Sequence, residues 1–188
     1  MTRSPIALLL ALLAVSGVRA APIVAGGART AAPAAAGPAE WRAFDINVRL
    51  ENLPRPYTCD ELWYRFHDVL LAIGARPDLQ ILTYHCADTR AASGRSPSVQ
   101  LEFRLPIALT AAQARYADLS AVPRTIRLAP GEPHSLTRGD CELLRQMGAS
   151  LLAALPVQVV GAALSCHRGT AAAAQPFALE VQALIPRS

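Results

Sequence analysis

Apolar and polar residues alternate along two segments of the chain, 44–53 and 98–105. Alternation with a period of two is typical of a strand with one buried face. The segment 79–86 lies between them and favours a further strand. In the second half of the chain, the segments 124–129, 157–166 and 177–185 have matching character. The pattern therefore predicts six strands.

Two other segments have the spacing of amphipathic helices. In residues 59–74, Thr58 and Glu61 form a capping-box pattern and Gly74 is a typical stop. The predicted buried face consists of Leu62, Phe66, Val69, Leu70 and Ile73. Residues 141–155 carry a corresponding face, and Pro156 ends that segment. Its members are Leu144, Leu151, Leu152 and Leu155.

The order strand, helix, strand, strand thus occurs twice. The cysteines support a duplication, because Cys59 and Cys86 are 27 residues apart while Cys141 and Cys166 are 25 apart. We expect an α+β fold in which two tandem βαββ repeats form an antiparallel sheet of about six strands. The two helices should cover one face and be related by a pseudo-twofold axis.

The chain divides into three expected regions. Residues 1–20 have an arginine, a short apolar run and a small-residue site ending at Ala20, which is typical of a cleaved secretory signal. Residues 21–40 are rich in Ala, Gly and Pro and predict a disordered linker. Residues 41–188 are expected to form one duplicated domain.

Within that domain, the first repeat is expected at 41–109 and the second at 123–188. The connector 110–122 contains Thr110 and Gln113 at capping-box spacing, which favours a short helix. Tyr116 would then cover part of the core.

Four cysteines in an exported chain indicate disulfides. A helix over 59–74 rises about 24 Å, and a strand over 79–86 returns about 23 Å. Cys59 therefore meets Cys86 at one end of the first unit, and the same argument joins Cys141 to Cys166. These two bridges would staple the domain.

The charge balance gives no argument for nucleic-acid binding. All basic residues are arginine, and the chain after Ala20 carries 16 of them against 14 acidic residues, a net charge of +2. A nucleic-acid-binding domain usually has a clustered basic face. We also expect no membrane span once the signal is removed.

Common catalytic and cofactor motifs are absent from the sequence. We therefore assign no catalytic residue, metal ligand or cofactor. One alternative stays open, because His85 precedes Cys86 and His167 follows Cys166. With reduced cysteines, these residues would suit a periplasmic protein that handles copper or zinc.

Two surfaces are candidates for a partner. The segments 87–97 and 167–176 are long for hairpin loops and carry Arg90, Arg95 and Arg168. On the first helix, Tyr64, His67 and Leu71 form a stripe opposite the buried face.

The sequence favours an exported, non-enzymatic binding or structural module of the cell envelope, periplasmic or secreted. Its partner would be another envelope protein, and the sequence does not set its oligomeric state. A second alternative is an enzyme whose site is assembled from dispersed residues.

Overall fold

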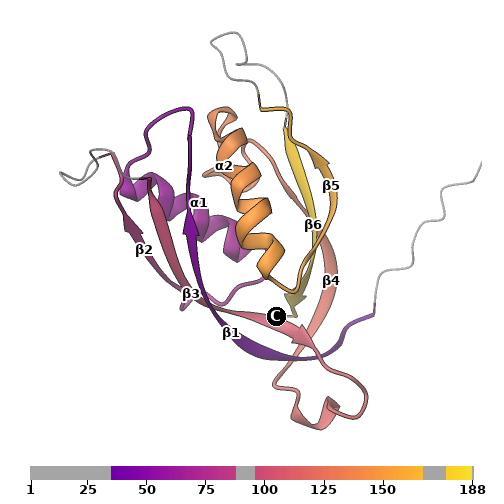
Figure 1. Cartoon of the computed structure of the whole chain (residues 1–188). Helices are drawn as coiled ribbons and strands as arrows, with labels where there is room; N and C mark the ends of the chain where they lie inside the picture. Colours follow the sequence, from indigo (N-terminus) through magenta and orange to yellow (C-terminus); the bar gives the residue numbers. More distant parts are fainter. Residues whose placement is uncertain (1–34, 88–95, 167–176, 188) are drawn as a thin grey trace, which may run out of the picture. The chain divides into compact units, whose positions relative to one another are not determined.

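The computed structural model describes residues 35–87, 96–166 and 177–187. These residues form an α+β unit with one six-stranded antiparallel sheet (Figure 1). The signal and most of the linker predicted at 1–34 lie outside the described residues. None of the helices in the described ranges has the length and apolar composition of a membrane span.

The strand order in the sheet is β2-β3-β1-β4-β6-β5. The ladder between β1 and β3 runs over eleven residue pairs, from Ala39 with Ala108 to Arg49 with Ser98. In contrast, β1 meets β4 through only three pairs, Gly37–Ala39 with Leu119–Ala121. The sheet therefore consists of two three-stranded parts joined by a short ladder. The strands are β1 (Gly37–Arg49), β2 (Gln80–Tyr84), β3 (Ser98–Ala108), β4 (Leu119–Leu128), β5 (Gln158–Ala163) and β6 (Ala178–Pro186).

Both helices form where their apolar spacing predicts. Helix α1 spans Cys59–Ala72 and begins with the expected capping box, in which Thr58 and Glu61 bond each other's backbone N–H groups. Helix α2 spans Cys141–Gln146 and continues as a π-helical turn, Met147–Leu151, and a 3₁₀ turn, Leu152–Ala154. Short 3₁₀ turns also occur at Ala114–Tyr116 and Arg138–Asp140.

One hydrophobic core joins the two helices to the sheet, and Figure 1 shows both helices on the same side of the strands. All residues predicted for the helix faces are buried, as are the inward residues of β3. The helix residues are Leu62, Phe66, Val69, Leu70, Ile73, Leu144, Leu151, Leu152 and Leu155.

The disulfides join Cys59 to Cys86 and Cys141 to Cys166. This pairing agrees with the argument from helix and strand lengths. Each bridge ties the N-terminus of a helix to the chain just after the strand that follows it.

Two expectations about the connections are wrong. Strand β1 begins at Gly37, inside the range 21–40 assigned to a linker, and Ala39 is buried. Backbone pairing with β4 holds this start, and it needs no large side chains. Within 110–122 the chain forms a 3₁₀ turn, Ala114–Tyr116, and then enters β4 at Leu119, and Tyr116 does not cover the core. Its side chain is 62% exposed, with Arg115 against its ring.

Candidate functional site

A fully buried carboxylate, that of Asp140, lies between the two halves of the chain. Asp140 ends the 3₁₀ turn before α2, where its Oδ2 accepts bonds from the backbone N–H of Thr137 at 2.7 Å and its hydroxyl at 2.9 Å. These contacts are local to the turn. They fix the carboxylate at the start of α2.

The other donors to Asp140 come from the first half of the chain. Tyr57 donates its hydroxyl to Oδ1 at 2.9 Å, and Arg55 donates to the same oxygen at 3.2 Å. Arg65, on α1, donates Nε to Oδ2 at 3.2 Å. A buried carboxylate is costly unless it is paired and hydrogen-bonded. Five donors meet that requirement, and we call these residues the Asp140 cluster: Arg55, Tyr57, Arg65, Thr137 and Asp140.

The cluster keeps Asp140 ionised. Burial alone would raise the pKa of this carboxyl, but the bonds from Thr137 and Tyr57 and the charge of Arg65 outweigh burial and lower the pKa below its usual value. Tyr57 responds in the opposite direction, because burial and the adjacent Asp140 charge raise the pKa of its phenol. Tyr57 therefore stays protonated and can keep donating its bond.

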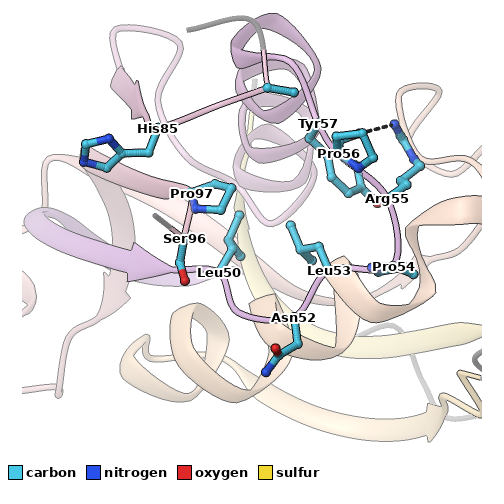
Figure 2. A pocket seen from close by; sticks show the side chains of 11 residues that line it. Leu50, Asn52, Leu53, Pro54, Arg55, Pro56, Tyr57, His85, Ser96 and Pro97 are labelled. Atoms are coloured by element: carbon cyan, nitrogen blue, oxygen red, sulfur yellow. Dashed lines mark hydrogen bonds between the residues drawn. The ribbon is translucent and has the colours of Figure 1, made fainter. Parts of the chain in front are cut away.

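A pocket of about 440 Å³ lies beside this cluster and shares Arg55 and Tyr57 with it. Its volume falls in the usual range for small-molecule sites. In Figure 2, Leu50 and Leu53 rise between Pro97 on one side and Pro56 and Tyr57 on the other. Arg55 lies at one end and His85 at the other, with the imidazole turned away from the two leucines. The full lining is Leu50, Asn52, Leu53, Pro54, Arg55, Pro56, Tyr57, His85, Ala87, Ser96 and Pro97.

Two residues that line this pocket have a strained backbone conformation. Among the described residues, the non-glycine residues with positive φ are Asn52, at 51°, and His85, at 57°, and both line it. Such conformations are uncommon and concentrate at ligand-binding and active sites. His85 is unusual in a second respect, because its Nδ1 is shielded from solvent and has no hydrogen-bond partner among the described residues. Buried polar atoms of this kind require an explanation.

Arg55 connects the pocket to the cluster. Its guanidinium lies 3.8 Å above the centre of the Tyr57 ring, bonds Glu61 at 3.0 Å and bonds Asp140 at 3.2 Å. The Arg55 side chain is nevertheless 34% exposed. It supplies the formal positive charge of the pocket wall, and the described lining contains no acidic residue.

The stripe predicted on the outer face of α1 is partly covered. Tyr64 is 55% exposed. His67, in contrast, stacks on Trp63 with ring centres 4.5 Å apart, and its Nδ1 lies 3.1 Å from a carboxylate oxygen of Asp68. Leu71 has intermediate burial. The three residues therefore do not form a continuous exposed surface.

The remaining candidate residues are divided between described and undescribed parts of the chain. Arg90, Arg95, Arg168 and His167 lie outside the described residues. The metal-handling alternative required reduced cysteines, whereas all four cysteines are in disulfides. In the described ranges, no three His, Cys, Asp or Glu side chains come together as a metal site.

The Asp140 cluster and the pocket were not predicted from the sequence. Thr137 and Asp140 have capping-box spacing, which could have indicated a cap before α2. Nothing local links Asp140 to Tyr57, because 83 residues separate them.

We compared the chain with models of protein families, with curated proteins and with solved structures, and none of the three comparisons gives a match.

Proposed function

We propose that this chain is an exported, disulfide-stapled binding module of the cell envelope, periplasmic or secreted, and that it binds its ligand in the pocket beside the Asp140 cluster. The observation that carries the proposal is the clustering of unusual features at this wall. Asn52 and His85, both with positive φ, line one pocket, and the buried Nδ1 of His85 has no hydrogen-bond partner among the described residues.

The lining favours a ligand with a small apolar body and an anionic or hydrogen-bonding head. Leu50, Leu53 and Pro97 offer an apolar surface. The cationic group of the lining is Arg55, which is paired with Glu61 and Asp140 and is 34% exposed. The end of a polypeptide from another envelope protein, or a small aromatic acid, has this chemistry.

The hydrogen bonds and the orientation of the polar side chains in the pocket favour binding rather than catalysis. The Tyr57 hydroxyl already bonds Asp140, so it serves the packing of the wall and is not available as a catalytic acid or base. His85 is the lining residue whose ring nitrogen is unpartnered, and its imidazole turns away from the centre of the pocket (Figure 2). General-base catalysis needs a base aimed at the reacting group.

We also propose that the domain arose by duplication, with a pseudo-twofold axis between the halves. Exchanging β1 with β4, β2 with β5 and β3 with β6 reverses the strand order β2-β3-β1-β4-β6-β5 onto itself. Each half also carries one disulfide with nearly the same sequence separation. In this interpretation the pocket belongs to the first half.

Export is tested by N-terminal sequencing of the protein from fractionated cells. We expect the periplasmic or secreted fraction to contain a chain that begins at Ala21. An intact Met1 in the cytoplasm would contradict export.

Binding is tested by NMR titration of the oxidised chain with benzoate and with benzamide, which differ in charge but hardly in shape. We expect saturable shifts at Leu53, Tyr57 and Ala87, with benzoate binding more tightly because of Arg55. Ser96→Trp and Leu53→Trp should fill the pocket and abolish both responses. Leu82→Trp, at an exposed position of β2, should leave them unchanged.

Absence of a saturable response to both compounds would contradict the proposal. A response that survives in a folded Ser96→Trp variant would contradict the assignment to this pocket.

A further inference from the structure

The segment 52–56 is one wall of the pocket, and its backbone is stiff beyond the first residue. Leu53 and Arg55 each precede a proline, which disfavours the helical conformation and keeps both residues extended. The course of the wall therefore depends on the turn at Asn52. In Figure 2, Leu50 and Leu53 rise on one side of this turn and the Asn52 side chain lies on the other.

The turn itself is strained. Asn52 has a φ of 51°, a conformation that asparagine tolerates better than most residues but that still costs free energy. A residue keeps such a conformation only where its surroundings hold it there. The contacts of Glu51, its neighbour in the chain, meet this requirement.

Both backbone groups of Glu51 bond the side chain of Gln146, the last residue of α2. The Gln146 amide oxygen accepts the Glu51 N–H at 2.9 Å, and the amide nitrogen donates to the Glu51 carbonyl oxygen at 2.6 Å. The same nitrogen donates to Glu142 at 2.8 Å, one helical turn earlier, which fixes the direction of the amide. No other hydrogen bond to the backbone of 51–53 occurs in the described part of the chain.

We propose that Gln146 is a positioning residue of the ligand pocket: it holds the strained turn at Asn52 and thereby sets where Leu53 lies in the pocket. This inference rests on the proposed function, because it assigns a role in the same site. The far end of the wall is held in a similar way, since Asp140, the residue before α2, bonds Tyr57. Both ends of α2 therefore hold the wall of a pocket that belongs to the first half of the chain.

The first test compares Gln146→Leu with Gln113→Leu in the oxidised chain. Gln113 is the matched control, because its amide oxygen also accepts two bonds, from the N–H and the hydroxyl of Thr110, and it does not line the pocket. Loss of two hydrogen bonds should raise the dissociation constant for benzoate about tenfold in Gln146→Leu, which corresponds to about 1.4 kcal/mol. Gln113→Leu should bind benzoate as the unmodified chain does.

A second readout needs no ligand. At positive φ the amide proton of a residue lies close to its own Hα, so the NOE between these two protons is strong. At Asn52 this NOE should weaken in Gln146→Leu and persist in Gln113→Leu. If Gln146 only added to the stability of the fold, the NOE would stay strong in the folded Gln146→Leu chain.

Glycine at position 52 provides a rescue, because glycine adopts positive φ without a steric penalty. In the Asn52→Gly background, Gln146→Leu should therefore weaken benzoate binding by a smaller factor than it does in the unmodified chain. Equal factors in the two backgrounds would overturn the inference, and so would a strong Asn52 NOE in folded Gln146→Leu.

Failure of the proposed function gives a different result. If the unmodified chain does not bind benzoate, the ligand site is wrong, whereas the Asn52 NOE still decides whether Gln146 holds the turn.

Discussion

The hydroxyl of Tyr57 donates a 2.9 Å hydrogen bond to the buried carboxylate of Asp140, 83 residues further along the chain. Tyr57 also forms part of the pocket wall. The bond therefore links the second half of the chain to the site proposed in the first half. Because Arg55 and Arg65 bond the same carboxylate, one acidic residue orders three side chains of the other half.

Replacing Asp140 should be among the most damaging single changes. Asp140→Asn removes the charge that faces Arg55 and Arg65, and breaking a buried pair in this way costs about 3–5 kcal/mol. The free energy of unfolding from urea denaturation measures this loss. Glu132→Gln is the control, because its ion pair with Arg127 is more than half exposed on both sides. The control should lose less than about 1 kcal/mol, and equal losses in the two variants would contradict the role of the cluster.

The same carboxylate predicts how stability depends on pH. Asp140 has a lower pKa in the folded chain than its usual value of 3.8, so protonation favours the unfolded chain. Its contribution is fully present above about pH 4–5 and is lost as the pH falls through the folded pKa. The free energy of unfolding should therefore decrease on acidification over this range.

In Asp140→Asn, the free energy of unfolding should still decrease on acidification, but less steeply. Glu61 is partly buried, which would raise its pKa, but bonds from Thr58 and Arg55 lower it, so Glu61 keeps part of the slope. Urea titrations of both proteins at a series of pH values measure the difference. An unchanged slope in Asp140→Asn would show that Asp140 is not ionised by the cluster.

Two glycines with positive φ predict different tolerances to alanine. At Gly74 a Cβ atom would come within 2.5 Å of the Leu184 carbonyl oxygen, whereas at Gly131 nothing lies within 4 Å. Gly131→Ala should cost only the conformational penalty of about 1–2 kcal/mol. Gly74→Ala should cost clearly more, because the end of α1 must also move away from β6. Thermal unfolding of the two variants decides this, and similar melting temperatures would contradict the close packing of α1 on β6.

The burial of the helix residues predicts how much stability is lost when each of three leucines is truncated to alanine. Leu70 and Leu152 are buried, whereas Leu71 has intermediate burial. Leu70→Ala and Leu152→Ala should each cost about 2–5 kcal/mol, and Leu71→Ala clearly less. Denaturant midpoints measure the three losses. A loss in Leu71→Ala equal to that in Leu70→Ala would place the outer face of α1 in the core.

The parts of the fold that follow from local patterns were predictable. The helix faces, the six strands and the cysteine pairs depend on periodicity and on lengths along the chain. The start of β1 was not predictable, because Gly37–Ala39 is held by backbone bonds to β4 rather than by apolar side chains. The exposure of Tyr116, which lies in the 3₁₀ turn Ala114–Tyr116, was not predictable from the local pattern either.

The candidate site could not be predicted from the sequence for a related reason. Arg55, Tyr57 and Asp140 come together only through tertiary packing, and each residue has ordinary neighbours in the sequence. The sequence drew attention instead to Tyr64, His67 and Leu71, whose spacing is regular. In the structure, the stacking of His67 on Trp63 interrupts that surface.

The most direct measurement of the central claim is the set of intermolecular NOEs between benzoate and the oxidised chain. Ligand binding in the proposed pocket predicts contacts from the benzoate ring protons to the methyl groups of Leu50 and Leu53, and their loss in Ser96→Trp. Contacts to the exposed side chains of Leu82 or Val160 instead, or no contacts under conditions in which the chain is folded, would contradict it.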